Sequence, residues 1–96
     1  MRQLSIVDMD QAVSVLLAAD PNSWNDLSLQ ILWQAKWADK YRKRTGKRHP
    51  VWGNGTVHDV CIRYPRYRSN YPTPDQYFQA MAQFLRTYVD GRHQKN

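Results

Sequence analysis

The stretch SWNDLSLQILWQAKWADKYRKRTG, residues 23 to 46, decides the fold because it carries one long apolar pattern. Apolar side chains recur along it every three or four residues, which is the period of an amphipathic helix. They are Trp24, Leu27, Ile31, Ala35, Ala38 and Tyr41. Trp33 and Trp37, four residues apart, are expected to widen this apolar face. Gly46 stands where a left-handed residue ends a helix. We therefore predict a helix over 23–45, capped by Asn22 or Ser23, as the spine of the protein.

A shorter helix is predicted before this spine, over about 8–19. Its apolar stripe consists of Met9, Ala12, Val13, Leu16 and Leu17. Asp8 suits either the N-cap or the first turn, where a negative charge is favourable. Pro21 ends this helix because proline cannot continue it.

Two more helices are predicted after the spine. Thr56 with Asp59 three residues on resembles a capping box and predicts a short helix over about 57–64, which Pro65 stops. Thr73 and Pro74 begin a fourth helix over about 74–90. Its apolar face consists of Tyr77, Ala80, Met81, Phe84, Leu85 and Tyr88. Gly91 is expected to end it, and a frayed tail over 92–96 follows.

The predicted fold class is all-α, with the remaining helices packed on the helix over 23–45. No segment alternates apolar and polar residues over any length, so strands are not expected. The 96 residues suit a single domain over 1–96.

Composition indicates a cytoplasmic protein. No apolar run approaches the length of a membrane span. Asp8 and Asp10 interrupt the region where a secretion signal needs apolar residues. Cys61 is the single cysteine, which excludes an internal disulfide and fits a reducing compartment.

The net charge of +6 is distributed unevenly. Residues 1–35 hold one cation and four Asp, whereas residues 36–96 hold thirteen cations and four Asp. This asymmetry favours a polyanionic partner, either nucleic acid or an acidic protein surface. The candidate contact residues are Lys36, Lys40, Lys43, Arg44, Lys47, Arg48, Arg63, Arg66 and Arg68. The alternative interpretation is that these cations end helices and keep the protein soluble.

Aromatic residues support two binding hypotheses. The segment RYPRYRSNY interleaves arginines with Tyr64, Tyr67 and Tyr71, residues able to stack on bases. Trp33, Trp37 and Trp52 add more aromatic surface than a small core easily buries, which favours a protein–protein adaptor as the alternative. The oligomeric state is left open.

Catalysis and metal binding are minor alternatives, and no cofactor is expected. His49, His58, Asp59 and Cys61 offer suitable residue types close together in sequence. Cys61, however, falls on the expected core side of its helix, and the spacing matches no closed zinc site. We expect no catalytic residue and no metal ligand.

The segment RKRTGKRHPVWGNGTV resembles the central part of an uncharacterised family of small alphaproteobacterial proteins, a domain of unknown function. The shared pattern reads R-x-x-T-G-x-x-H-P-x-W-G-[DN]-G-[ST]. It is matched by Arg42, Thr45, Gly46, His49, Pro50, Trp52, Gly53, Asn54, Gly55 and Thr56. The later segment RYPRYRSNYP is more basic and aromatic than the family pattern. The resemblance implies no activity.

The motif loop with His49, Trp52 and Asn54 has two possible roles. As a structural loop, Trp52 anchors it in the bundle, Gly53 and Gly55 allow positive φ, and the His49 side chain bonds a backbone carbonyl. As a ligand site, the same side chains face a partner. The sequence favours the structural role.

Overall fold

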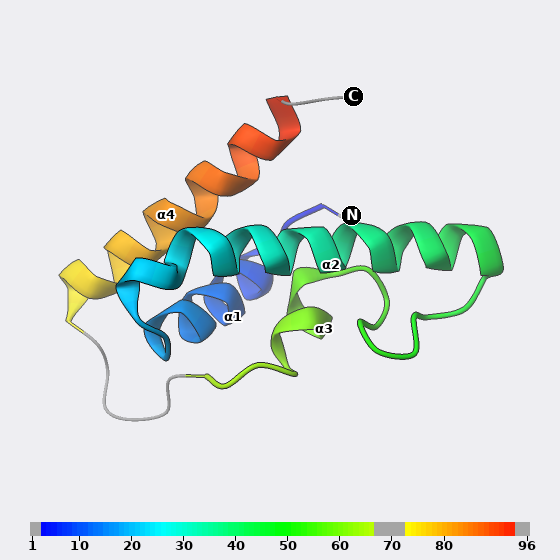
Figure 1. The fold of residues 1–96 in the computed structure, drawn as a ribbon, viewed down its shortest axis with the longest axis horizontal. Coiled ribbons are helices and arrows are strands. Elements are labelled where there is room, and N and C mark those ends of the chain that lie inside the picture. Colours follow the sequence, from blue (N-terminus) through cyan, green and yellow to red (C-terminus); the bar gives the residue numbers. More distant parts are fainter. Residues whose placement is uncertain (1–2, 67–72, 94–96) are drawn as a thin grey trace.

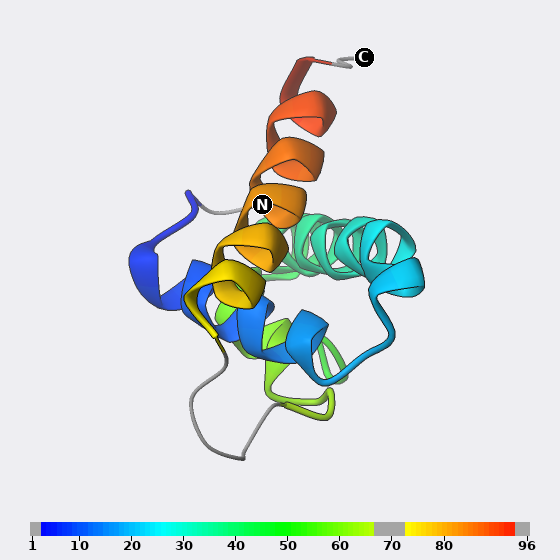
Figure 2. The same ribbon diagram turned by 90° about the vertical axis from the view of Figure 1, so that its left-hand side faces the viewer.

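The computed structural model describes residues 3–66 and 73–93, which confirm the all-α fold class. The helices are α1 (Ile6–Leu17), a short 3₁₀ turn η1 (Pro21–Ser23), α2 (Trp24–Thr45), α3 (Val57–Cys61) and α4 (Pro74–His93). The long α2 contacts α4 and α3, while α1 packs against α3 and α4 (Figure 1). The carboxyl end of α4 projects away from the other helices (Figure 2).

The first helix begins earlier than the sequence pattern predicts. Ser5 is the N-cap, and its hydroxyl accepts a hydrogen bond from the Asp8 amide at 3.2 Å. The Asp8 carboxylate accepts in return from the Ser5 amide at 2.9 Å, which completes a capping box. Asp8 is therefore the first-turn anion and not the N-cap. The helix ends at Leu17, before the predicted position 19, and the Trp24 ring nitrogen donates to the Leu16 carbonyl there.

The second helix has the predicted extent, but its buried face is narrower than predicted. Ile31, Ala35 and Ala38 are fully buried. Trp33 and Trp37 are 53% and 42% exposed, so the expectation that they widen the core face is wrong. Ser23 is the N-cap residue of α2, as one of the two predicted caps, but its side chain makes no capping hydrogen bond. Asp20 caps the preceding turn η1, where its carboxylate accepts from the Asn22 amide at 2.9 Å.

The hydrophobic core lies between α1, the first half of α2, α3 and α4. Small and medium side chains dominate it, and Phe84 is its largest member. The buried cluster comprises Ala12, Val13, Val15, Leu16, Ile31, Ala35, Val57, Val60, Cys61, Ala80 and Phe84. The core ends before the end of α2, because every residue over 40–48 is exposed. Figure 1 shows this end of α2 extending beyond the other helices, with the following loop folded back beneath it.

The last two helices differ from prediction at their carboxyl ends. The third helix stops at Cys61 and not at 64. After it, the amides of Arg63 and Tyr64 donate to carbonyls three residues back, which tightens the last turn before Pro65. The fourth helix starts as predicted, with the Thr73 hydroxyl accepting from the Gln76 amide at 3.2 Å. It continues through Gly91 to His93, so Gly91 does not end it and 92–93 are not part of a frayed tail. The remaining tail, 94–96, lies outside the described residues.

Candidate functional site

The loop over 46–56 starts from a left-handed glycine and then closes on itself. Gly46 has φ +74°, as a helix-ending residue requires. His49 and Gly53 exchange two backbone hydrogen bonds of 2.8 and 3.1 Å. The His49 ring nitrogen Nδ1 accepts from the amides of Val51 and Trp52, both at 3.0 Å. The imidazole is thus an acceptor for backbone amides and does not donate to a carbonyl as the sequence analysis proposed. This role requires the neutral tautomer with its proton on Nε2.

Two glycines let the loop lie directly against the helices. Gly53 and Gly55 have φ of +85° and +98°. A Cβ atom at Gly53 would lie 2.6 Å from the carboxylate of Asp59 on α3. A Cβ atom at Gly55 would lie 2.8 Å from the Cα atom of Asp39 on α2. Both positions therefore need glycine for the backbone conformation and for the close approach.

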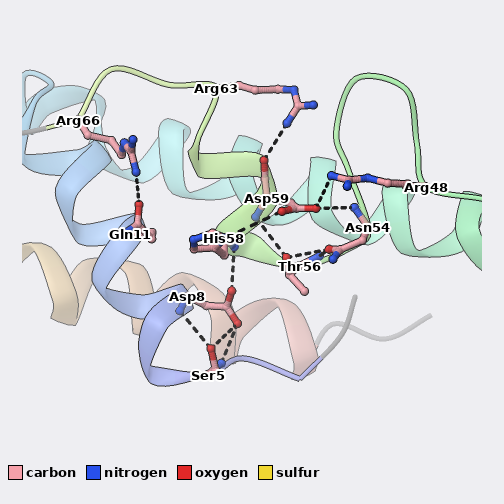
Figure 3. Close-up of polar contacts among 10 residues, drawn as sticks. All are labelled: Ser5, Asp8, Gln11, Arg48, Asn54, Thr56, His58, Asp59, Arg63 and Arg66. Atoms are coloured by element: carbon pink, nitrogen blue, oxygen red, sulfur yellow. Dashed lines mark hydrogen bonds and ion pairs between the residues drawn. The ribbon is translucent and has the colours of Figure 1, made fainter.

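A carboxylate on α3 fastens the loop from the other side (Figure 3). Oδ2 of Asp59 accepts from the Asn54 amide at 2.9 Å and from the Arg48 guanidinium at 3.0 Å. The Thr56 hydroxyl caps α3 by accepting from the Asp59 amide at 3.2 Å. The predicted capping box is only half formed, because the Thr56 amide donates to the Asn54 side chain instead of to Asp59. The motif residue Asn54 therefore has a structural role.

Between this loop and α2 lies a pocket of about 300 Å³ that is open to solvent on one side. Its lining residues are Trp33, Trp37, Lys40, Tyr41, Arg44, His49 and Trp52. Five of them carry rings, and Trp33, Trp37, Lys40, Tyr41 and Arg44 from α2 follow one another at three- and four-residue helical spacings, which places them on one helix face. The sequence-predicted residues Lys40, Arg44, His49 and Trp52 meet here.

The rings of the pocket form a continuous chain of contacts. His49 stacks on Trp52 with centroids 4.6 Å apart and planes 9° apart. Trp52 also meets the edge of Trp33 at 5.4 Å, and Trp33 lies 6.0 Å from Trp37. Tyr41 lies 5.0 Å from His49, centroid to centroid, in a T-shaped arrangement. The ammonium group of Lys40 lies 4.7 Å from the Trp37 ring centroid, a cation–π distance. Trp52 is half-buried, so it both anchors the loop and lines the pocket.

The other predicted cations do not line the pocket. Lys36 and Lys47 are exposed, and Lys43 pairs with Asp39 at 3.1 Å. Around α3, Arg48 pairs with Asp59, and Arg63 donates to the Asp59 backbone carbonyl at 3.0 Å. Arg66 donates instead to Gln11 on α1, and neither residue lines the pocket. Figure 3 shows this contact. Tyr67, Arg68 and Tyr71 lie outside the described residues.

The residues considered for catalysis or metal binding have different structural roles in the fold. Cys61 is fully buried, and burial, with a smaller effect of the Asp8 carboxylate, raises the pKa of its thiol to about 12 against the opposite effect of Arg66. His58 donates its backbone amide to Asp8, and its ring lies 3.9 Å from the Asp59 carboxylate. Within the described ranges 3–66 and 73–93, no three His, Cys, Asp or Glu side chains are grouped so that they could hold a metal ion.

We expect the Cys61 thiol to resist modification in the folded protein. A thiol reagent attacks the thiolate, and burial suppresses both its formation and the access of the reagent. Labelling at neutral pH should therefore be slow in buffer and fast in denaturant. Cys61→Ala should lower the free energy of unfolding by only about 1 kcal/mol through a small void. Fast labelling of the native protein would contradict the buried position.

The fold and site together define a small all-α protein with an aromatic and cationic surface pocket. The chain belongs to a family described as a domain of unknown function (DUF7742), whose model matches residues 2–88. No curated protein and no solved structure matches the chain. Across 3–66 and 73–93, no helix combines the length and the apolar character needed to cross a bilayer.

Proposed function

We propose that this protein is a non-catalytic binding module that engages a polyanion through the second half of α2 and the loop over 46–56. The observation that carries the proposal is the uninterrupted exposure of residues 40–48. This segment contains six cations, Lys40, Arg42, Lys43, Arg44, Lys47 and Arg48, and no acidic residue. Arg42 was part of the sequence motif but not of the predicted contact set.

Electrostatics explains why such a segment favours a polyanion over a single small anion. A row of exposed cations gains most from a partner whose charges repeat at similar spacing, since each contact releases counterions. Lys36 extends the row by one helical turn on the amino-terminal side. Lys43 and Arg48 already pair with Asp39 and Asp59. Arg42 lies about 200° around the helix from both Lys40 and Arg44. The cations we assign to the partner are therefore Lys36, Lys40, Arg44 and Lys47.

The proposal gives the family motif a physical meaning. Its Gly46, His49, Gly53 and Gly55 build the loop, and its Trp52 lines the pocket. We propose that this R-x-x-T-G-x-x-H-P-x-W-G motif marks the binding region in alphaproteobacterial relatives. A cytoplasmic location would bring the protein into contact with nucleic acid and with acidic proteins.

Charge neutralisation tests the proposal. We expect the combined change of Lys36, Lys40, Arg44 and Lys47 to Gln to weaken binding to a single-stranded oligonucleotide and to flatten its salt dependence. The slope of log affinity against log salt should fall by about 0.7 for each lost phosphate contact on a single strand. Fluorescence anisotropy at several salt concentrations measures this slope.

A matched pair of single variants controls for net charge. Arg44→Gln at the pocket and Arg86→Gln on the exposed side of α4 remove the same charge by the same substitution. Only Arg44→Gln should weaken binding clearly. Binding that ignores salt, or equal effects of the two variants, would argue against this surface.

A second candidate function, a protein–protein adaptor, has its own observation. Phe78 and Val89 on α4 are 62% and 46% exposed and lie eleven residues apart, which places them on one face of the helix. Exposed apolar side chains of this kind mark protein contacts when they gather in a patch. Recovery of partners from the native cell with and without nuclease separates the adaptor from nucleic-acid binding, because only partners held through nucleic acid disappear after nuclease treatment.

A further inference from the structure

The pocket combines two ligand preferences that differ in kind. Its walls are rings, and its rim carries the cations Lys40 and Arg44. Trp33 and Trp37 leave about half of their surface to solvent, which is unusual for tryptophan in a protein whose core accepts Phe84. The ligand should therefore offer a flat apolar surface and a negative charge next to it.

The charge at the rim excludes one common ligand of aromatic pockets. Rings arranged around a cavity often bind methylated ammonium groups through cation–π attraction. Here Lys40 already occupies the Trp37 ring at 4.7 Å, and Arg44 adds a second positive charge. A cationic ligand would be repelled by both groups. An anionic ligand would instead attract the flexible Lys40 side chain and uncover the ring face.

The shape of the pocket then distinguishes among the anionic partners that could bind it. Asp and Glu side chains provide negative charge but carry no ring of their own. Duplex nucleic acid keeps its bases paired and stacked inside the helix. A single strand has both features, because its bases are free to stack on aromatic side chains while the flanking phosphates contact cations. The volume of about 300 Å³ is at the lower end of ligand pockets, which leaves room for one base.

We infer that the pocket between α2 and the loop over 46–56 binds one unpaired base of a single-stranded nucleic acid, with Lys40 and Arg44 contacting the neighbouring phosphates. The inference rests on the proposed polyanion binding and specifies its partner. Trp37 is the test residue because it lies outside the core cluster and contacts one ring of the chain, Trp33, whereas Trp33 also contacts Trp52.

The experiment compares four labelled probes by anisotropy with the full chain in low salt. They are a thymidine strand of about 12 nucleotides, within the range of single-strand site sizes, an abasic strand with equal phosphates, a duplex of the same length, and an acidic peptide of equal charge. We expect the thymidine strand to bind about tenfold tighter than the abasic strand. A tenfold difference corresponds to about 1.4 kcal/mol, which is within the range of one base–aromatic stack.

Variants of Trp37 test whether the difference in affinity between the thymidine and abasic strands arises at the pocket. Trp37→Ala should weaken binding of the thymidine strand about tenfold and leave the abasic strand nearly unchanged, while Trp37→Phe, which keeps a ring, should retain most of the affinity. Phe78→Ala is the control, since Phe78 is an exposed ring on α4 away from the pocket. Thermal melting confirms that each variant is folded. If Trp37→Ala fails to fold, the affinities of the unchanged protein for the thymidine and abasic strands still decide whether a base contributes to binding.

The outcomes separate the two proposals. Equal affinity for thymidine and abasic strands overturns the base pocket while polyanion binding stands. Equal or tighter binding of the duplex, or binding of the acidic peptide that depends on Trp37, also overturns it. If no anionic probe binds with a salt-dependent affinity, the polyanion proposal itself fails and the base pocket fails with it.

Discussion

Asp8→Ala is expected to lower the free energy of unfolding by about 3 kcal/mol, because one buried carboxylate serves two helices. The Asp8 side chain accepts from the amide and hydroxyl of Ser5, both at 2.9 Å, and from the His58 amide at 2.8 Å (Figure 3). It thereby caps the amino ends of α1 and α3, and its negative charge favours both helix dipoles. Removal leaves three partly buried donors without this acceptor, and a fully buried donor in that position costs about 1–3 kcal/mol. Urea denaturation followed by circular dichroism measures the loss.

Three variants test the shared role of Asp8. Asp26→Ala changes an exposed Asp in the first turn of α2 and should cost no more than about 0.5 kcal/mol. Ser5→Ala removes only the cap of α1 and should cost about 1 kcal/mol. The loss of unfolding free energy for Asp8→Asn should lie between those for Ser5→Ala and Asp8→Ala. The amide of Asn presents one acceptor oxygen where the carboxylate presents two. A loss for Asp8→Ala as small as that for Asp26→Ala would show that the link between the helices contributes little.

Gly55→Ala is the second change for which we expect a large effect, again about 3 kcal/mol. At φ +98° an L-residue is strained, which costs about 1–2 kcal/mol. The added Cβ would also lie 2.8 Å from backbone of α2 at Asp39, and backbone cannot rotate away as a side-chain end can. Overpacking of this kind costs about 1–3 kcal/mol more. Since the loop must move off α2, tryptophan fluorescence of the native protein should change together with stability.

Gly46→Ala provides the matched control in the same loop. Its φ of +74° is also left-handed, but a Cβ there meets open space. Only the conformational strain should remain, at about 1 kcal/mol. Equal losses for the two variants would show that the contact between Gly55 and Asp39 is not what makes glycine necessary at position 55.

The sequence predicted a helix end correctly where the residue that marks it acts on its immediate neighbours. Gly46, Thr56 and Thr73 act within a few residues, so the ends they mark agree with the structure. The start of α1 was missed although Ser5 and Asp8 have the same spacing as Thr56 and Asp59. The prediction that Gly91 ends the fourth helix was wrong, because glycine weakens a helix only modestly and α4 continues through it.

The pocket was only partly predictable. Helical geometry turns about 100° per residue, so Trp33 lies about 200° from Ile31, and Trp37 lies as far from Ala35. This arithmetic already places both rings opposite the buried face, and it was available from the sequence. What no periodicity contains is the return of His49 and Trp52 to that face. Their return depends on the close approach of Gly53 to α3 and of Gly55 to α2, which are tertiary contacts.

The turn over 49–53 has a thermodynamic consequence for any ligand. Its amides at His49, Val51, Trp52 and Gly53 are all hydrogen-bonded within the turn itself. The backbone that carries the stacked rings of His49 and Trp52 is therefore ordered before a partner arrives. Association then has little main-chain entropy to lose on this side, and the unfavourable ordering falls mainly on the long side chains of Lys40 and Arg44 and on the ligand. Because the ring surface of His49 and Trp52 is ordered before binding, a flexible strand can reach a given affinity with fewer or weaker contacts.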